Sequence, residues 1–245
     1  MPMRAMILAA GRGERMRPLT DTCPKPLLPV GGRPLIEWHL LRLARAGIRE
    51  VVINHAHLGH LIEAALGDGA RWSLKIRYSP EAQALETAGG IAQALPLLGH
   101  EPFLVVNGDV FTDFDFGRAP GIALQMQAAR LDAWCVMVPN PAQHPHGDFT
   151  VRAGRLLRAQ PNDTCTFSGV ALYQPSVFAG IAPGTRLALR PILDALIDAS
   201  RAGAECHDGQ WVDVGTVERL AQLDAQCRLN AAPPHGAQAQ LSGAG

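Results

Sequence analysis

Excess charge, long apolar runs and paired cysteines are all missing from this chain. Its 22 basic side chains balance its 22 acidic ones, so no overall field draws nucleic acid or an anionic membrane to it. No segment reaches the roughly 18 apolar residues of a membrane helix, and the apolar stretch around Met6 is too short for a signal-peptide core. Five cysteines without a C-x-x-C pair argue against a disulfide framework. We therefore expect a cytoplasmic protein that has neither nucleic acid nor a membrane as its partner and binds anions only locally.

Lysine is scarce as well, since Lys25 and Lys75 are the only two. Lys25 lies between two prolines, downstream of a glycine-rich turn that follows the apolar stretch 5–10. Gly11 and Gly13 allow the backbone to bend and approach a phosphate without a Cβ in the way, and N–H groups exposed in such a turn bind anions. An apolar strand, a glycine turn and one compact positive charge together indicate a nucleoside-triphosphate site.

Other phosphate-binding and catalytic motifs do not fit. In the dinucleotide motif G-x-G-x-x-G the third glycine would fall on Met16, and neither lysine follows a glycine as a Walker A loop requires. No G-x-S-x-G elbow indicates a Ser/His/Asp triad. A tight surface turn is the plain alternative for the glycine segment, and the proline-flanked Lys25 weighs against it.

The stretch from Leu8 reads L-x-x-G-x-G-x-R-M-x-P-L-T, and P-K-P-L follows around Lys25. These motifs resemble the signature of the sugar-1-phosphate nucleotidylyltransferases. The resemblance continues through N-G-D at 107–109 and W-V-D-V-G-T at 211–216, and it covers about residues 3–227. It implies a Rossmann-like three-layer α/β/α fold with a mostly parallel central sheet and a small inserted β subdomain that binds the sugar.

The resemblance also implies roles for individual residues. In that family the glycine-rich loop wraps the triphosphate, the lysine of P-K-P neutralises phosphate oxygens, and two separated aspartates hold Mg²⁺, the expected cofactor. The expected catalytic residues are Arg15, Lys25 and Asp109, and the expected metal ligands are Asp109 and Asp213. The nucleotide is expected to contact Gly11, Arg12, Gly13, Lys25, Glu86, Gly89, Gly90 and Asn107. The sugar phosphate is expected to contact Asn107, Asp148, Ser168 and Gly169.

One segment departs from the family pattern. Many relatives carry E-K-P, with its lysine on the sugar phosphate, where this chain reads R-A-Q-P at 158–161. Gln160 cannot supply that charge, and Arg158 is the candidate replacement. Either the sugar phosphate is held differently here or the acceptor is unusual.

The order of strand-like and helix-like segments agrees with an α/β fold. Up to residue 106 they alternate as in a parallel sheet with crossover helices. The expected strands are 5–10, 51–54, 74–78 and 103–106, and the expected helices are 35–46, 58–66 and 89–97. Because open α/β sheets bind ligands at the carboxyl ends of their strands, the glycine turn and Asp109 should meet in one crevice.

The second half of the chain predicts shorter strands. They are expected at 133–138, 148–151, 155–159 and 166–173, forming much of the sugar-binding subdomain at about 133–175, with helices at 189–202 and 216–229. We therefore expect one nucleotidyltransferase domain, residues 1–229. The remainder, residues 230–245, is rich in Ala, Pro, Gly and Gln and is expected to be a disordered tail.

Two further clusters resemble metal sites but have plainer interpretations. Asp113 and Asp115 form a D-x-D pattern, which we expect to be part of the loop after a strand. His55, His57 and His60 come between a strand and a helix with no cysteine nearby, so we expect solvated or supporting histidines and not a zinc site.

Nucleotidyl transfer explains why such a site needs positive charge. A phosphate monoester has a second pKa of about 6, so its oxygen attacks the α-phosphorus without a general base. The obstacle is repulsion between two anions, which Mg²⁺, Lys25, Arg15 and backbone amides would neutralise.

The substrate expectation depends on resemblance alone. The compact length, the missing E-K-P lysine and the G-D-F and T-F-S-G segments resemble a short bacterial branch that makes UDP-N-acetylmuramic acid in cell-wall recycling. We expect UMP transfer from UTP to N-acetylmuramic acid 1-phosphate. A mannose-1-phosphate guanylyltransferase, another hexose-1-phosphate enzyme and a non-catalytic sugar-nucleotide sensor or subunit stay open as alternatives, as does the oligomeric state.

Overall fold

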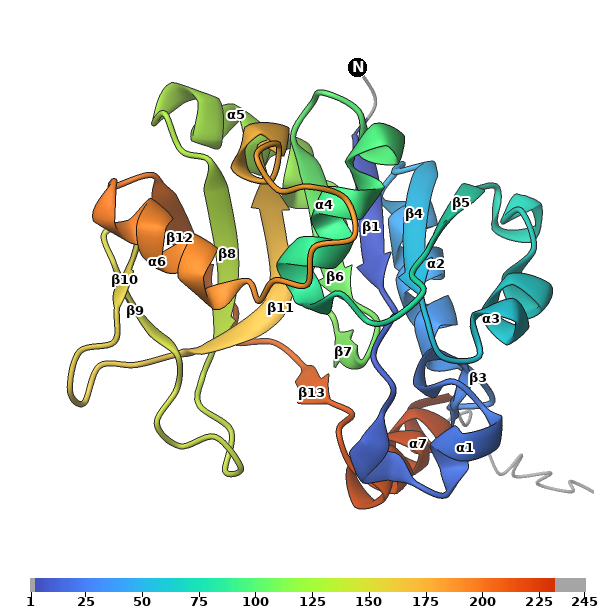
Figure 1. The fold of residues 1–245 in the computed structure, drawn as a ribbon. Coiled ribbons are helices and arrows are strands. Elements are labelled where there is room, and N and C mark those ends of the chain that lie inside the picture. Colours follow the sequence, from blue (N-terminus) through green and yellow to red (C-terminus); the bar gives the residue numbers. More distant parts are fainter. Residues whose placement is uncertain (1–2, 232–245) are drawn as a thin grey trace, which may run out of the picture.

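One nine-stranded sheet lies between two layers of helices in the structure, a computed structural model that describes residues 3–231 (Figure 1). Across the sheet the strands lie in the order β5-β4-β1-β6-β11-β8-β12-β10-β9. In chain order they are β1 (Arg4–Leu8), β4 (Glu50–His55), β5 (Lys75–Pro80), β6 (Phe103–Asn107), β8 (Ala133–Val138), β9 (Phe149–Arg152), β10 (Arg155–Arg158), β11 (Thr166–Tyr173) and β12 (Ala202–Cys206). The predicted α/β class is confirmed.

The strands β5, β4, β1 and β6 are mutually parallel. The three inner strands β4, β1 and β6 are mostly buried apolar runs because helices cover both faces of this half of the sheet, whereas the edge strand β5 alternates buried with more exposed residues. β1 ends at Leu8, two residues earlier than predicted, because the Ala9 N–H donates to the side chain of Asn54 and no longer to a neighbouring strand.

The other half of the sheet is mixed. β11 is antiparallel to both β6 and β8, β12 is parallel to β8, and β10 is antiparallel to β12 and β9. The strands of segment 133–175 therefore continue the same sheet. That this segment binds a sugar stays a prediction.

The helix predicted for 189–202 is wrong at its end. α6 spans Arg190–Asp198, and residues 202–206 form β12. Ser200 adopts φ 57°, a left-handed conformation that stops the helix. A Cβ on Gly203 would lie 2.5 Å from the Trp134 ring, so β12 needs a glycine at this position. Because glycine is not typical of strands, the sequence did not indicate this strand.

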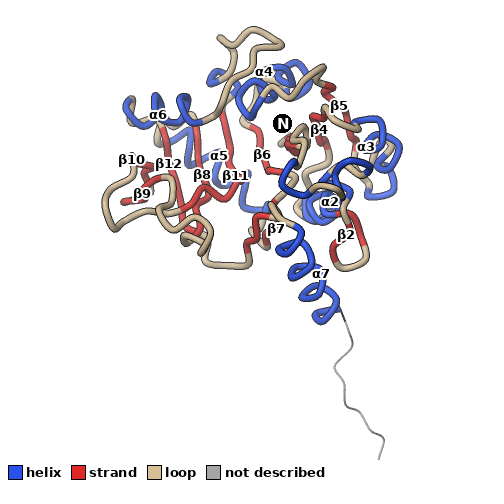
Figure 2. The backbone as a smooth tube through the Cα atoms, turned by 60° about the horizontal axis from the view of Figure 1, so that its bottom comes forward, coloured by secondary structure: helices blue, strands red, loops and turns tan. Residues whose placement is uncertain are grey.

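Helices cover the two faces of the sheet separately (Figure 2). The helices α2 (Leu35–Arg45), α3 (Gly59–Leu66) and α5 (Ala119–Ala128) pack on one face, and α4 (Glu86–Leu98) and α6 pack on the other. Within β1 the side chains alternate, because Ala5 and Ile7 join the first core and Met6 joins the second. The predicted three-layer arrangement is confirmed.

A third apolar cluster lies beyond the carboxyl ends of the parallel strands. It contains Met16 after the glycine loop, together with Phe111, Val214 and Leu220. Phe111 lies in β7 (Val110–Thr112), which pairs with β13 (Trp211–Asp213) in a two-stranded ribbon. Val214 directly follows β13, and Leu220 lies in α7 (Val217–Ala231). The cluster holds three distant segments together at the edge where ligands bind in such sheets.

Short elements complete the described chain. They are the ribbon β2 (Pro29–Val30) and β3 (Arg33–Pro34), the helix α1 (Leu19–Thr22), and 3₁₀ turns at Glu14–Met16, Lys25–Leu27, Ala70–Trp72, Phe116–Arg118 and Pro175–Val177. Residues 230 and 231 extend α7, and the rest of the predicted tail, 232–245, lies outside the described residues.

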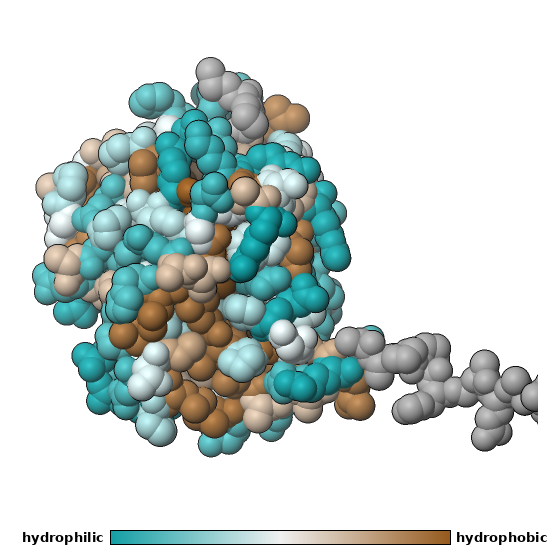
Figure 3. Space-filling view, turned by 90° about the vertical axis from the view of Figure 1, so that its right-hand side faces the viewer, coloured by the Kyte–Doolittle hydropathy of each residue, from teal (hydrophilic) through white to brown (hydrophobic). Residues whose placement is uncertain are grey.

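One face of the molecule combines polar and apolar areas. On the side seen in Figure 3, hydrophilic side chains dominate the upper part and a hydrophobic patch lies in the lower half. Exposed large apolar side chains include Leu19 in α1 and Val217 and Leu229 in α7. None of the described helices is long and apolar enough to cross a bilayer.

Candidate active site

The glycine-rich loop leaves β1 at the carboxyl edge of the sheet and is fixed in shape. At its start, the Ala9 N–H donates to Asn54 Oδ1 at 2.9 Å, which joins it to the end of β4. Gly13 has φ 69°, and an added Cβ would lie 3.0 Å from Thr20 Cγ2, so glycine is required there. The Thr20 hydroxyl donates to Gly13 O at 2.9 Å.

Lys25 and Asp109 meet at the end of this loop. The Lys25 side chain is only 9% exposed, and its Nζ lies 2.6 Å from Asp109 Oδ2. The turn that places Asp109 is equally constrained, because the Gly108 N–H donates to Leu8 O at 2.8 Å and a Cβ on Gly108 would clash with that oxygen. The structure thus brings the proline-flanked lysine and the N-G-D aspartate into direct contact.

The β7–β13 ribbon carries Asp213 to the same place. Asp213 lies opposite Val110 in the ribbon, and the Val214 N–H donates to Asp109 O at 2.9 Å. Both carboxylates line one cavity of about 290 Å³. Asp213 Oδ2 accepts a hydrogen bond from Arg219 Nη1 at 2.8 Å.

The donor set fits a small hard cation that keeps part of its own shell. Among the described residues, Asp109 Oδ1 and Asp213 Oδ1 accept no hydrogen bond, and no group of three or more His, Cys, Asp or Glu side chains gathers to hold a metal. Mg²⁺ typically takes one or two carboxylates and completes its shell with phosphate oxygens and water. Asp109 and Asp213 are the residues that could hold it.

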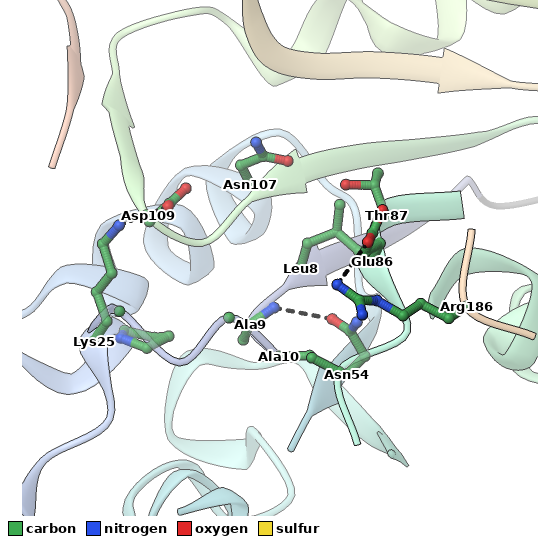
Figure 4. A pocket seen from close by; sticks show the side chains of 14 residues that line it. Leu8, Ala9, Ala10, Lys25, Asn54, Glu86, Thr87, Asn107, Asp109 and Arg186 are labelled. Atoms are coloured by element: carbon green, nitrogen blue, oxygen red, sulfur yellow. Dashed lines mark hydrogen bonds and ion pairs between the residues drawn. The ribbon is translucent and has the colours of Figure 1, made fainter. Parts of the chain in front are cut away.

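Two cavities share Asp109 in their linings, and Figure 4 shows the first of them. The first, of about 300 Å³, lies between the glycine loop and the start of α4, and its lining includes Gly11, Gly13 and Lys25. The second is the cavity of about 290 Å³, which lies beside β11 and the ribbon. Asn107 lines both cavities, as Asp109 does. Two ligands bound in these cavities would therefore contact each other at this junction.

The start of α4 forms the far wall of the first cavity. Glu86 has φ 61°, an uncommon conformation for a residue with a side chain, and its carboxylate lies 2.9 Å from Arg186 Nη2. Gly89 and Gly90 do not line the cavity. A Cβ on Gly89 would lie 2.1 Å from Thr185 O, and a Cβ on Gly90 would lie 2.7 Å from Asn54 Nδ2. The two glycines therefore let α4 pack closely on these neighbouring groups. Their contact with a nucleobase stays a prediction.

The expected sugar-phosphate residues separate into liners and supports. Ser168 lines the second cavity, and its carbonyl accepts from Trp211 Nε1 at 2.8 Å. Gly169 has φ 79° and packs on Asn107, where a Cβ would lie 2.7 Å from the amide. Asp148 is not among the liners, because its two oxygens accept from His144 Nε2 at 3.0 Å and from the Phe167 N–H at 2.9 Å.

Two arginines approach Asp213, one of the expected metal ligands, from outside the cavities. Both lie around Gly215, next to Asp213. A Cβ added to Gly215 would be 2.4 Å from Arg219 Nη2, and it would be 3.1 Å from both Arg15 Nη2 and Asp213 Oδ2. Arg15 is thus close to Asp213, as its expected role requires. Arg12 is exposed and lines neither cavity.

Arg158, the candidate replacement for the missing lysine, does not line the second cavity. It lies on β10, where its guanidinium binds Asp198 Oδ2 at 2.7 Å and Asp194 Oδ1 at 3.5 Å on α6. Strand β10 is separated from the site by β12 and β8, so Arg158 stabilises the docking of α6.

The D-x-D pattern is part of the loop after β7, as expected. His207 Nε2 lies 2.7 Å from Asp113 Oδ1, while Asp115 caps a 3₁₀ turn by accepting the Gly117 N–H at 2.9 Å. Burial raises the pKa of Asp113, but hydrogen bonds from the Gln210 backbone and from His207 outweigh it and lower the pKa overall.

The three clustered histidines do not form a metal site within the described chain. His55 is buried and lies 2.7 Å from Glu63, His57 Nε2 lies 3.2 Å from Thr20 O, and His60 is exposed. That these histidines are solvated or supporting, and bind no zinc, stays a prediction.

Sequence reasoning missed several residues that line or support the site. Asn54 lies next to the carboxyl end of β4, so the strand-end rule that places the glycine turn and Asp109 in one crevice would also have found it. Arg219 follows W-V-D-V-G-T by one helical turn, which is a usable signal. Arg186 and His144 lie in loops without a motif, and only the folded chain brings them to the cavities.

Comparison with known proteins agrees with this geometry. Residues 4–229 match the model of the nucleotidyl transferase family, and the chain belongs to that family, whose members transfer a nucleotidyl group to a sugar 1-phosphate. The N-acetylmuramate alpha-1-phosphate uridylyltransferase of Neisseria meningitidis serogroup B is 54% identical over 226 residues, which cover 91% of this chain and 97% of the relative.

Two further comparisons agree. A protein of the same name from Caulobacter vibrioides is 34% identical over 93% of this chain and 97% of its own length. A solved structure from Bacillus anthracis that carries the name glucose-1-phosphate thymidylyltransferase matches with a TM-score of 0.80 at 23% identity, over 92% of this chain and 95% of that one. The last similarity shows the fold.

Proposed function

We propose that this chain transfers UMP from UTP to N-acetylmuramic acid 1-phosphate, giving UDP-N-acetylmuramic acid and pyrophosphate. The observation that carries the proposal is the junction of the two cavities at Asn107 and Asp109, with Lys25 bound to the same aspartate. The two relatives named for this reaction support the choice of base and sugar. The expected cytoplasmic location and the single domain of residues 1–229 belong to the same proposal.

The proposed reaction places one anion in each cavity. A non-bridging oxygen of the sugar phosphate forms a bond to the α-phosphorus of UTP, and the bond from that phosphorus to the bridging oxygen breaks, so pyrophosphate leaves with the electron pair. The glycine-loop amides and Lys25 bind phosphate oxygens, and Arg15 adds positive charge beside Asp213. Positioning and charge neutralisation therefore supply most of the catalysis.

Magnesium is the proposed cofactor, held by Asp109 and Asp213. When bound, it would neutralise phosphate charge and fix the orientation of the phosphate oxygens. Lys25 binds Asp109 and Arg219 binds Asp213, and these positive charges reduce the repulsion between the two carboxylates.

Substrate profiling tests the proposal. We expect Mg²⁺-dependent pyrophosphate release with the highest kcat/KM for UTP and N-acetylmuramic acid 1-phosphate, compared with UTP and N-acetylglucosamine 1-phosphate, dTTP and glucose 1-phosphate, and GTP and mannose 1-phosphate. A faster reaction with GTP and mannose 1-phosphate would assign the chain to the guanylyltransferases. No turnover with any pair would favour a non-catalytic sensor or subunit.

Asp109→Ala serves as the inactive reference in the same assay. Because it removes a proposed metal ligand and the partner of Lys25, we expect loss of most turnover with a circular dichroism spectrum like that of the unsubstituted protein. Near-normal turnover would contradict the proposed role of Asp109.

A further inference from the structure

The second cavity has an unusual distribution of charge for a site that takes an anion. Its lining includes the carboxylates of Asp109 and Asp213, and among the described residues that line it only His144 can carry a positive charge. The family lysine of E-K-P is absent, and Arg158 is bound elsewhere. His144 is therefore the one cationic group that this cavity offers to a ligand away from the metal ligands.

His144 is held in a defined position. Its Nε2 lies 3.0 Å from Asp148 Oδ1, and Asp148 Oδ2 accepts the Phe167 N–H at 2.9 Å, which ties the loop to β11. With Nε2 bonded to a carboxylate, a protonated imidazole has its Nδ1–H left to donate.

The loop that carries His144 is braced from within. Asn140 Nδ2 donates to Thr164 Oγ1 at 2.9 Å, and Asn140 Oδ1 accepts from Thr166 Oγ1 at 2.9 Å. Gly147 has φ 58° and packs directly on Asn140, where a Cβ would lie 2.4 Å from Oδ1. A braced loop presents its histidine without a large entropic cost on binding.

The proposed acceptor carries a second anion that other hexose 1-phosphates lack. N-acetylmuramic acid is N-acetylglucosamine with a lactic acid ether at O3, so it adds a carboxylate remote from the phosphate. We infer that His144, positioned by Asp148, binds this carboxylate and makes the second cavity selective for a carboxylate-bearing sugar 1-phosphate. This inference rests on the proposed function, because it assigns a residue to one group of the proposed substrate.

The test compares two sugars that differ only in the O3 lactic acid ether that carries the carboxylate. The kcat/KM values for N-acetylmuramic acid 1-phosphate and N-acetylglucosamine 1-phosphate are measured at saturating UTP, and the second sugar is measured as a competitive inhibitor if it is not turned over. His144→Ala should lower kcat/KM for the muramic substrate about tenfold, as expected for loss of a hydrogen bond between charged groups. It should leave the values for the second sugar and the KM for UTP unchanged.

Three variants separate recognition from a structural role. His144→Arg keeps a cation and should retain the preference for the muramic substrate. Asp148→Asn removes the charge that positions the imidazole, and should raise KM for that substrate more than it lowers kcat. His146→Ala removes an exposed histidine of the same loop, and it should leave the kinetic constants for both sugars unchanged.

The outcomes are distinct. If His144→Ala lowers kcat/KM or inhibitor affinity equally for both sugars, or changes neither, the inference is overturned while the proposed function stands. If the unsubstituted protein uses both sugars equally well, the cavity is not selective and the inference is likewise overturned. If the unsubstituted protein does not use the muramic substrate at all, the proposed function fails, and the assignment of His144 falls with it.

Discussion

Single residues carry unequal weight in this site, and Lys25 shows why. It is nearly buried, at 9% side-chain exposure, yet keeps its charge partner Asp109 at 2.6 Å. A buried cation needs such a partner because desolvation is costly. In the proposed reaction the ammonium would meet the triphosphate while already aligned beside the carboxylate, and an electrostatic contact that needs no reorganisation contributes most to catalysis.

Lys25→Ala should therefore slow the reaction strongly. We expect a loss of about 3 kcal/mol of transition-state stabilisation, which is about a hundredfold in kcat/KM. Steady-state pyrophosphate release measures it. Lys75→Ala is the matched control, because Lys75 is the only other lysine and is exposed on β5. Equal activity of the two variants would place Lys25 outside the reaction.

Residue-scale prediction from the sequence succeeds where a motif fixes the local backbone. Gly13, Gly108 and Lys25 were identifiable because their turns need glycine or a compact charge in any chain that folds this way. Arg158 could be named only as a candidate, because the sequence does not reveal that aspartates of α6 bind it. His144 and Arg186 were missed for the same reason, since their approach to the cavities depends on packing between distant segments.

At the scale of elements, the first turn of α4 and the loop 184–189 act as one unit. The N–H groups of Ala88 and Gly89 donate to Leu187 O at 3.0 and 3.1 Å, and the Leu187 N–H donates to Leu85 O at 2.9 Å. Arg186, on the same loop, lines the first cavity. The wall of that cavity therefore depends on a close backbone contact that only a glycine in the helix permits.

Gly89→Ala should disrupt this contact. The added Cβ would lie 2.1 Å from Thr185 O, a backbone atom that cannot rotate away, so we expect destabilisation by about 2 kcal/mol and a higher KM for UTP. Urea denaturation and kinetics measure the two effects. Gly121→Ala in α5 is the control, since a Cβ there meets nothing within 4 Å and should stabilise the protein by up to about 1 kcal/mol. Unchanged stability of Gly89→Ala would show that the loop can shift freely.

Element prediction followed the strength of the periodic signal. The parallel strands and the amphipathic helix α2 were identified because long apolar patterns have few interpretations. The ribbon β7–β13 was missed because three-residue strands show no periodicity, and α5 because its small and polar residues give a weak apolar face. These are the elements whose position is decided by what they pack against.

For the whole molecule, the buried His39 of α2 links stability to pH. Its exposure is 1%, and burial, reinforced by Arg42, lowers its pKa from 6.5 to about 4. Below pH 6.5 His39 binds a proton in the unfolded chain, whereas in the folded protein it stays neutral until the pH approaches 4. Stability is therefore lost as the pH falls from 6.5 toward 4, and His39 contributes almost no pH dependence above that window.

His39→Leu should flatten this dependence. Between pH 7 and pH 5 the unsubstituted protein should lose about 2 kcal/mol more unfolding free energy than the variant does. Urea denaturation at both pH values gives the difference. If the two proteins lose equal amounts, another group is responsible for the acid sensitivity.

The position of β12 in the sheet sets the order in which the protein can mature on the ribosome. Strand β12 joins the hairpin β9–β10 to β8, so the hairpin has no place in the sheet until residues 202–206 have been synthesised. The parallel strands, by contrast, are all present once residue 107 has emerged. A nascent chain therefore holds all four strands of the parallel half early, and the β9–β10 hairpin joins the sheet only after residue 206 has been made.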